Sequence, residues 1–428
     1  MNSRRIVRTF AILLLFCNTL FAHQIDGSRL VNAVHELTWA TPKLAARYQH
    51  TKKLNENLWR AVKAMQKFDP ILAMGYASQC HGEALIKRDV ALARLCSAVA
   101  SAFADAAGRP DIGLHWAGQA GVSKGADQPI FDQLDAYLSG NAASVALFKN
   151  KKLEPIEYAP SLPPVVYLKM HPVMLPVGSD DKSQVRLPAI VAEKGSKKVH
   201  FLLDSGAPSF ISTSSANVLG FSSFGWRINV GTLDQCTAYL ERGKIAGFDL
   251  GALRVPGMEL WRSSSSCHEY SSVNVLGFDF FYRVRRLFID YENDVVGIGS
   301  GLTKGEVGMS GGTCIRLGFR FSPILVEGNV SLPGSVRGEM VSVMPDLGNS
   351  IGVLISPSAY KRLLLQGVIE PGKSSDKTVS LPLTLGDRAF LVNAIVRPNP
   401  VGIDVVLPYS FFTKWFFDYD DGILCGER

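Results

Sequence analysis

One stretch of the chain delivers a carboxylate to the end of an apolar strand. Residues 199–203 are mostly apolar, and Asp204, Ser205, Gly206 and Ala207 follow directly. The apolar run predicts a buried strand, Gly206 offers a turn with unrestricted φ, and Ser205 is a short hydroxyl that can hydrogen-bond the backbone. Asp, Ser and Gly are also common in ordinary turns. The triplet therefore indicates chemistry only if a second carboxylate meets the first.

A second stretch of the same kind occurs nearer the C-terminus, where the apolar residues 340–345 lead into Asp346, Leu347 and Gly348. Three features recur in the same order in both stretches: an Asp-x-Gly triplet, an apolar strand ending in Gly or Pro, and a Phe-x-Asp-Tyr turn (204–206, 275–277 and 288–291; 346–348, 406–408 and 416–419). An order of several features is much less frequent by chance than one triplet. We interpret it as a duplicated β unit in which the two aspartates belong together.

The elements around these motifs change character along the chain. Its 428 residues are 47% hydrophobic and 19% charged, which suits two or three domains with ordinary cores. Residues 28–148 show helical spacing of apolar residues and predict a small α-helical domain, with a docking arm or an inhibitory segment as functional alternatives. The prolines of residues 149–164 predict an extended linker. Short apolar runs separated by Gly, Ser and Asn follow, and they predict β units over 165–303 and 304–428.

The N-terminus has the pattern of a signal peptide. Arg4, Arg5 and Arg8 precede the apolar run 10–21, so residues 1–22 are predicted to be a cleaved leader. The protein is therefore expected to be exported, to a periplasm or the medium. It would contact a membrane only if the leader stayed uncleaved.

Removal of the leader leaves an even number of cysteines, which favours disulfides in an exported protein. Six cysteines allow fifteen pairings, and sequence position suggests three bonds: Cys80 with Cys96, Cys236 with Cys267, and Cys314 with Cys425. No CxxC motif occurs and the eight histidines are scattered, so no metal site is expected. The net charge of +7 is spread along the chain, which argues against nucleic-acid binding.

From about residue 163 the chain resembles a two-lobed aspartic peptidase of the pepsin type, and its first lobe is especially similar to bacterial retropepsin-like domains. The resemblance implies a mainly β, two-lobed pepsin-like (acid protease) β-barrel fold preceded by the small α-helical domain. It also implies a catalytic dyad with supporting residues: Asp204 and Asp346, with Ser205, Gly206, Gly348 and Ser350. The family's flap hairpin would fall between residues 228 and 242, with Tyr239 as its candidate aromatic residue.

The chemistry implied by this resemblance is peptide hydrolysis without a cofactor. Two carboxylates held close share one proton. The ionised member would take a proton from water, which attacks the scissile carbonyl, while the protonated member donates to the carbonyl oxygen. The expected partner is a peptide or protein substrate, and the expected state is a monomer.

The second lobe departs from the family pattern at two positions. Leu347 replaces a Thr or Ser whose hydroxyl stiffens the dyad, and Pro408 stands where glycine is expected. An alternative hypothesis is therefore an inactive, peptidase-like module that binds peptides. Pairing of the first lobes of two chains is disfavoured because this chain carries its own second lobe. Three further acids are expected to be turn or surface residues: Asp290, Asp404 and Asp418.

Overall fold

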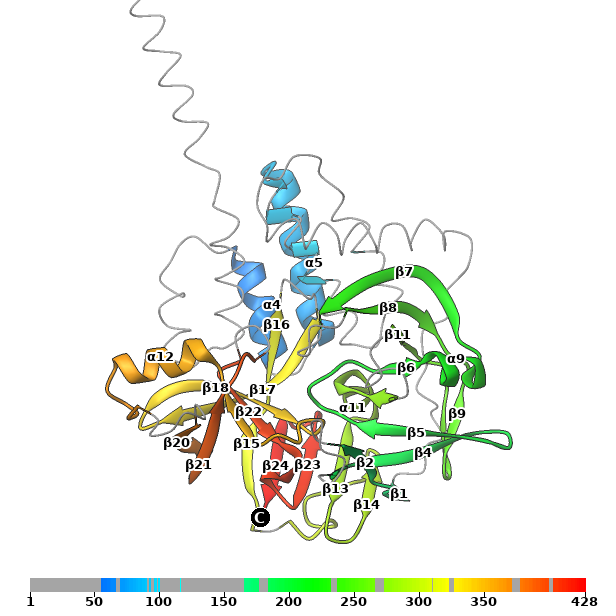
Figure 1. Ribbon diagram of the computed structural model, residues 1–428. Coiled ribbons are helices and arrows are strands. Elements are labelled where there is room, and N and C mark those ends of the chain that lie inside the picture. The colour runs from blue at the N-terminus through cyan, green and yellow to red at the C-terminus, as the bar shows by residue number, and fades with distance from the viewer. Residues whose placement is uncertain are drawn as a thin grey trace, which may run out of the picture.

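The structure is a computed structural model. It describes residues 55–66, 70–90, 92–93, 96–97, 99–100, 116, 165–176, 184–231, 237–265, 273–309, 311–322, 327–371, 378–399 and 403–428. These residues form mainly strands in several sheets, with few helices (Figure 1). The predicted leader, the predicted linker and much of the predicted helical region lie outside the described residues.

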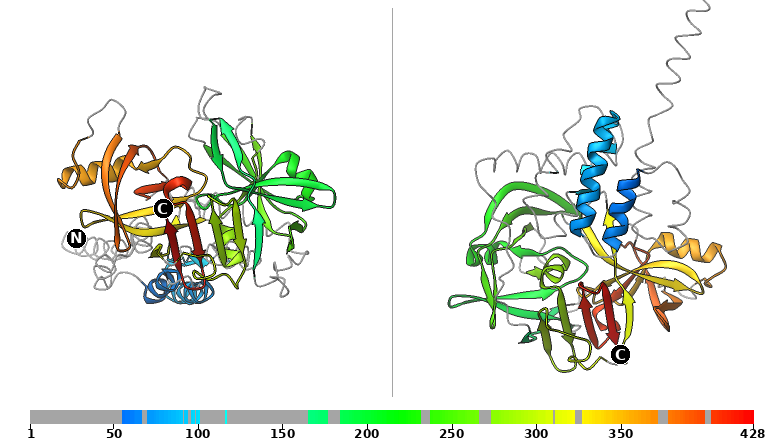
Figure 2. Two further views of the ribbon diagram at one scale, coloured as in Figure 1. Left: turned by 90° about the horizontal axis from the view of Figure 1, so that it is seen from below. Right: turned by 180° about the vertical axis from the view of Figure 1, so that it is seen from behind.

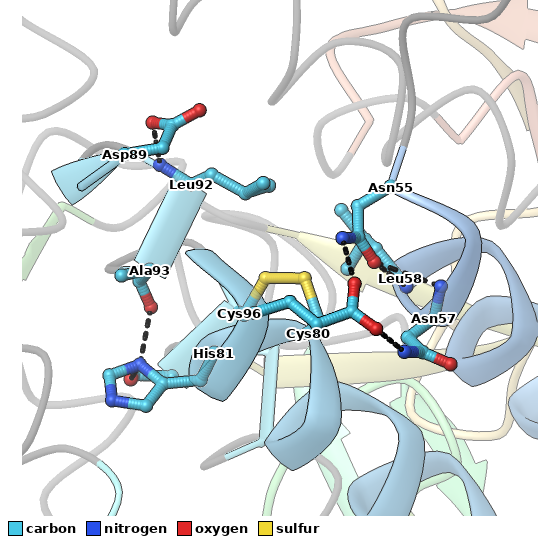
Figure 3. Close-up of a disulfide and its surroundings, with 11 residues drawn as sticks. Asn55, Asn57, Leu58, Cys80, His81, Asp89, Leu92, Ala93 and Cys96 are labelled. Carbon is cyan, nitrogen blue, oxygen red and sulfur yellow. Dashed lines mark hydrogen bonds between the residues drawn. A yellow bond between two sulfur atoms is a disulfide. The ribbon is translucent and has the colours of Figure 1, made fainter. Parts of the chain in front are cut away.

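The helical region contributes α4 (Glu56–Gln66) and α5 (Pro70–Ile86). Glu83 of α5 accepts hydrogen bonds from the side-chain amides of Asn55 (2.8 Å) and Asn57 (2.7 Å), which ties the start of α4 to α5. A disulfide joins Cys80 to Cys96, the pairing expected from sequence position (Figure 3). None of the helices in the described part of the chain is long and apolar enough to span a membrane.

A nine-stranded sheet follows, with the strand order β10-β9-β4-β5-β12-β6-β11-β8-β7. Its strands are β4 (Ala189–Lys194), β5 (Lys197–Leu203), β6 (Phe210–Ser212), β7 (Ser222–Gly231), β8 (Thr237–Lys244), β9 (Phe248–Leu250), β10 (Leu253–Val255), β11 (Glu259–Ser265) and β12 (Val275–Leu276). The helices α9 (Thr213–Leu219) and α11 (Phe278–Val284) accompany it. Phe201 of β5 and Phe248 of β9 are fully buried and stack at 5.6 Å between ring centroids, so β5 is anchored in the core.

A seven-stranded sheet lies on the other side of the molecule, in the order β16-β17-β18-β22-β19-β21-β20 (Figure 1). Its strands are β16 (Gly318–Ser322), β17 (Glu327–Val336), β18 (Glu339–Asp346), β19 (Val353–Ile355), β20 (Thr378–Leu385), β21 (Arg388–Val396) and β22 (Val405–Pro408). The helix α12 (Pro357–Leu365) and the 3-10 turn η1 (Tyr409–Phe411) accompany it.

These two sheets share one pairing scheme around their central strands. In the first, β12 runs parallel to β5 and antiparallel to β6. In the second, β22 runs parallel to β18 and antiparallel to β19. The order of features duplicated in the sequence thus corresponds to duplicated strand pairing. We call residues 189–298 the first repeat and residues 313–427 the second repeat.

A six-stranded sheet connects the two repeats, in the order β1-β14-β13-β23-β24-β15 (Figure 2). Its strands are β1 (Val166–Lys169), β13 (Arg286–Asp290), β14 (Val295–Ile298), β15 (Thr313–Arg316), β23 (Lys414–Asp418) and β24 (Ile423–Glu427). Phe288 of β13 lies opposite Phe416 of β23 at its centre. Its four central strands are therefore two equivalent pairs, one from each repeat, with β1 and β15 at the edges. A separate hairpin pairs β2 (Val173–Pro176) with β3 (Gln184–Leu187).

Ion pairs fasten the central strands of this sheet on both sides of its middle. Arg286 contacts Asp418 at 3.0 Å, and Lys414 contacts Asp290 at 3.9 Å. Both aspartates also accept two backbone N–H groups from the turns that follow them, at 2.9–3.0 Å. Asp290 and Asp418 are thus buried structural residues at the start of exposed turns, and the expectation of a surface position is wrong for them. Asp404 is likewise buried, and it accepts a hydrogen bond from the Arg362 guanidinium (2.8 Å).

The second described disulfide joins Cys314 of β15 to Cys425 of β24, which lie directly opposite each other in the register. This pairing also agrees with the expectation from sequence position. The third expected pair, Cys236 with Cys267, lies outside the described residues.

Candidate active site

Two central strands, one from each repeat, place Asp204 and Asp346 at the same point between the sheets. Asp204 follows β5 directly, and its N–H donates to the carbonyl of Leu276 at the end of β12 (3.1 Å). Asp346 is the last residue of β18 and lies opposite Pro408 of β22. Because both strands are embedded in the core, the two carboxyls are held by rigid elements.

Each Asp-x-Gly triplet faces the carboxyl of the other. A Cβ added at Gly206 would lie 2.7 Å from the Cγ of Asp346, and a Cβ added at Gly348 would lie 2.6 Å from the Cγ of Asp204. Neither glycine has a positive φ, so the expectation that Gly206 serves through its conformational freedom is wrong. The glycines are needed because any side chain there would displace the opposing carboxyl.

The hydrogen bonds of the two carboxyls are also matched. The N–H of Gly206 donates to Asp204 Oδ1 (2.8 Å), and the N–H of Gly348 donates to Asp346 Oδ1 (3.0 Å). Each carboxyl also lies close enough to the other to affect its pKa. Two carboxyls this close do not ionise independently. The arrangement therefore suits a pair that holds one shared proton.

Burial is the main reason why the pKa values of both aspartates are raised. Desolvation raises the pKa of Asp204, opposed by hydrogen bonds from backbone N–H groups and from Asp346. Desolvation and the adjacent charge of Asp204 raise the pKa of Asp346 well above its usual range. Because the groups are coupled, the proton belongs to the pair rather than to either residue. Both residues keep part of their surface exposed, so a ligand has access to them.

A single hydroxyl links the two triplets. Ser205 is fully buried, and its Oγ donates to the carbonyl oxygen of Pro345 (2.7 Å) and accepts from the N–H of Leu347 (3.3 Å). Leu347 has no hydroxyl with which to return the interaction, and its side chain is buried in the core. Of the two hydroxyls expected to join the triplets, the one at position 347 is therefore missing, and the one of Ser205 is present.

The surroundings of Pro408 differ from those of its counterpart Gly277. In the first repeat, Gly277 packs against the backbone of residues 207–209, and its N–H donates to Ser209 Oγ (2.9 Å). Pro408 lacks this N–H. The loop in the second repeat is also longer, because Phe210 lies six residues after Asp204, whereas the equivalent Leu354 lies eight residues after Asp346. The proline therefore coincides with a change in the length of the loop that follows the aspartate.

Two other residues expected at the site, Ser350 and Tyr239, lie on a loop and on a strand. Ser350 is half-buried in the loop after Asp346. At the start of this loop the Asp346 carboxyl accepts from the N–H of Gly348 (3.0 Å), and the Asp346 backbone carbonyl accepts from the N–H of Asn349 (3.1 Å). Tyr239 lies on β8 opposite Asn229 of β7, in a hairpin whose tip (232–236) is outside the described residues. This hairpin extends from the first repeat toward β17 (Figures 1 and 2).

Sequence reasoning missed a tyrosine beside the dyad. The hydroxyl of Tyr291 is buried and has no hydrogen-bond partner among the described residues. Burial raises the pKa of Tyr291 well above its usual range, with smaller effects from Tyr409 and Asp204. Its ring lies 5.4 Å from that of Tyr409, and Tyr409 and Ala207 both pack against the small apolar cluster of Leu187, Leu202 and Val275. The repeated Phe-x-Asp-Tyr pattern was the available signal, but it was interpreted only as a turn.

No group of three or more His, Cys, Asp and Glu side chains suited to a metal occurs among the described residues. The groups that the structure brings together are thus two carboxyls, a bridging hydroxyl and backbone N–H donors.

Comparison with known proteins adds little to this geometry. No protein-family model matches the chain, and no curated protein matches it. A solved structure, the crystal structure of a retropepsin-like aspartic protease from Rickettsia conorii, matches with 14% sequence identity and a TM-score of 0.19. The match covers 31% of this chain and 92% of that chain. A likeness this slight carries no weight for fold or function.

Proposed function

We propose that this protein is an exported aspartic endopeptidase with a two-lobed, pepsin-like arrangement. The observation that carries the proposal is the reciprocal packing of the two triplets, in which each glycine lies against the opposite carboxyl. This packing brings Asp204 and Asp346 together, with each residue keeping part of its surface exposed. A pair of partly buried carboxyls with raised pKa values suits general acid–base hydrolysis of a peptide.

The mechanism follows from the shared proton. The ionised carboxylate takes a proton from a water molecule, and the resulting hydroxide equivalent attacks the scissile carbonyl carbon. The protonated carboxyl donates to the carbonyl oxygen, which gives a tetrahedral diol. Collapse of the diol transfers a proton to the leaving nitrogen and restores the singly protonated pair. No covalent enzyme intermediate forms.

Substrate binding is proposed to use the β7–β8 hairpin and the loops next to the two triplets. An extended peptide between the repeats would present its backbone N–H and C=O groups to the hairpin as an added strand. The proposed monomer needs no partner chain, because both aspartates come from one polypeptide.

Export is part of the proposal and has its own support. The Cys80–Cys96 and Cys314–Cys425 disulfides are compatible with a periplasmic or extracellular location. Expression in a host with an export pathway, followed by mass spectrometry of the N-terminus, tests cleavage after residue 22. Recovery of the intact N-terminus from the cytoplasm would contradict the proposal.

The catalytic proposal is tested with a peptide library at acid to neutral pH. Purified protein is expected to cleave a subset of peptides and to be inhibited by a statine-type transition-state analogue. Asp204→Asn and Asp346→Asn should each abolish cleavage, whereas Asp387→Asn, a change at an exposed turn residue, should leave it unchanged. Full activity in Asp346→Asn would refute the intramolecular dyad.

The competing function is peptide binding without cleavage, which the loss of the hydroxyl at Leu347 motivates. Ser205 still links the two triplets through Pro345 and Leu347, so we favour catalysis. A protein that retains peptides but cleaves none at any pH would establish the binding function instead.

A further inference from the structure

A surface cavity of about 470 Å³ lies on the second repeat, away from the two aspartates. Its floor is the outer face of the β20–β21 hairpin, where Pro382 lies opposite Leu391. One wall is the loop 368–371 after α12, and another is the turn between β17 and β18 at Arg337. The elements α12, β20 and β21 lie on the far side of the second repeat from the first repeat (Figures 1 and 2). None of the described lining residues belongs to an Asp-x-Gly triplet.

The strand pairing explains how the cavity arises. β20 pairs with β21 along its whole length, but it pairs with β17 only over residues 383–385. β17 ends at Val336, and the chain then turns back into β18. Residues 378–382 of β20 therefore have no partner on that side among the described strands, and the space beside them is left open.

Two oppositely charged side chains line this cavity. Arg337 and Glu370 are exposed, and neither side chain makes an ion pair or a hydrogen bond with the described residues, including each other. Glu370 is held in place because it follows the buried Ile369, and the N–H of Val368 donates to the Leu363 carbonyl of α12 (2.9 Å). A guanidinium and a carboxylate that face one cavity without pairing are complementary to a ligand that carries both charges.

The backbone at Arg337 is unusual for a residue with a long side chain. The first residue of the two-residue turns β4–β5, β9–β10 and β20–β21 is a glycine with a φ of 57–60° (Gly195, Gly251 and Gly386). Arg337 stands at the same position of the β17–β18 turn, with a φ of 48°. Glycine would adopt this angle without strain, whereas arginine does not. An arginine at a position that favours glycine indicates a role for its side chain, which lines the cavity.

The rest of the lining offers apolar surface and hydrogen-bonding groups. Leu391 is 76% exposed and lies beside Pro382, while Ser380 and Asn393 lie opposite each other on the same face of the hairpin. Cavities of about 300–1,000 Å³ with a few polar groups are typical of ligand sites.

We propose that this cavity binds a short peptide with free ends and an aliphatic side chain. Arg337 pairs with the terminal carboxylate, and Glu370 pairs with the terminal ammonium group. Leu391 contacts the aliphatic side chain, and Ser380 and Asn393 hydrogen-bond the peptide groups. The inference goes beyond the proposed peptidase activity and does not depend on it, because neither aspartate takes part.

Blocked peptides test which protein charge reads which end. Binding of the tripeptide Leu-Ala-Leu is measured by calorimetry and compared with its N-acetylated form and its C-terminal amide. Wild type should bind the free peptide at least about fivefold more tightly than either blocked form, the scale of one charge-assisted hydrogen bond at an exposed site. Arg337→Gln should lose the preference for the free carboxylate and keep that for the free amine. Glu370→Gln should show the reverse.

The chain offers a matched control for each variant. Arg88 is also exposed with a positive φ (58°), but it lies just after α5 and outside the cavity. Glu339 is exposed at the start of β18, next to the same turn, and does not line the cavity. Arg88→Gln and Glu339→Gln should keep both preferences within about twofold of wild type, since exposed charges elsewhere contribute little.

Each outcome decides the proposal. Absence of binding at millimolar peptide, or equal affinities of wild type for the free and blocked peptides, would overturn it without any variant. Preferences that persist in Arg337→Gln and Glu370→Gln would show that the peptide binds elsewhere. A protein that cleaves no peptide would contradict the proposed function and leave this test unaffected.

Discussion

Replacing Ser205 with alanine should both destabilise the protein and slow peptide cleavage. The change removes one oxygen that satisfies two buried backbone groups, the carbonyl of Pro345 at 2.7 Å and the N–H of Leu347 at 3.3 Å. Each buried group left without its partner costs about 1–3 kcal/mol. Because the second contact is long, we expect the free energy of unfolding to fall by about 2–4 kcal/mol.

The same change should affect catalysis more than a general loss of stability would. Ser205 is the hydroxyl that links the strand segments carrying the two aspartates, and Leu347 offers no replacement. Loosening the dyad by a fraction of an ångström should lower kcat by about 10- to 100-fold, with a smaller effect on KM. Urea denaturation followed by tryptophan fluorescence gives the stability, and peptide cleavage well below the unfolding transition gives the kinetics.

Ser214→Ala is the control, because Ser214 is exposed and hydrogen-bonds only at the start of α9. It should change the free energy of unfolding by less than about 0.5 kcal/mol. Equal urea midpoints and equal kcat values for the two alanine variants would show that the Ser205 hydroxyl does not hold the two aspartates in position.

Three further predictions follow from the site and the connecting sheet. Gly348→Ala places a Cβ 2.6 Å from the Asp204 Cγ, so it should reduce peptide cleavage at least about 100-fold. The control Gly305→Ala, at an open position, should leave cleavage unchanged. Equal activities of the two variants would show that the close approach of Gly348 to Asp204 is unimportant. The raised pKa of Asp346 in the folded state means that its contribution to stability is full below about pH 3.9 and is lost as pH rises through the folded pKa. The thermal midpoint of wild type should therefore fall from pH 4 toward neutral, and Asp346→Asn should flatten this fall; parallel pH curves would contradict the burial of that charge. Replacing both cysteines of the β15–β24 disulfide with alanine should lower the free energy of unfolding by about 2–5 kcal/mol, since the bond closes a loop with a sequence separation of 111. An unchanged urea midpoint would show that the bond adds no stability.

The pairing of the two aspartates could be predicted because it depends on order along the chain. Each repeat carries its triplet at the end of an apolar strand, and a duplicated unit places equivalent strand ends near each other. The expected Cys80–Cys96 and Cys314–Cys425 bonds also join cysteines in adjoining elements. The first bond is local, with a sequence separation of 16, whereas the second depends on the pairing of β15 with β24 across a separation of 111.

The reasons for individual residues were harder to predict. Gly206 was expected to provide unusual backbone angles, but it provides space for a carboxyl that belongs to the other repeat. Pro408 coincides with a loop that is two residues longer, which only the register reveals. The closeness of Tyr291 to Asp204 depends on packing between distant segments of the first repeat, which no local pattern predicts. These properties arise between segments far apart in the sequence, so no local pattern encodes them.

The connecting sheet has a consequence for how the two repeats can change. Its central strands β13 and β23 bring Arg286 opposite Asp418 and Asp290 opposite Lys414, the exchange of partners that a twofold axis would produce. In a dimer of identical halves, every substitution occurs twice, so a leucine in place of the serine would remove both hydroxyls at once. In one chain the same change occurs once. Covalent joining of the halves thus lets the second repeat carry Leu347 and a longer loop while the first keeps the hydroxyl that both require.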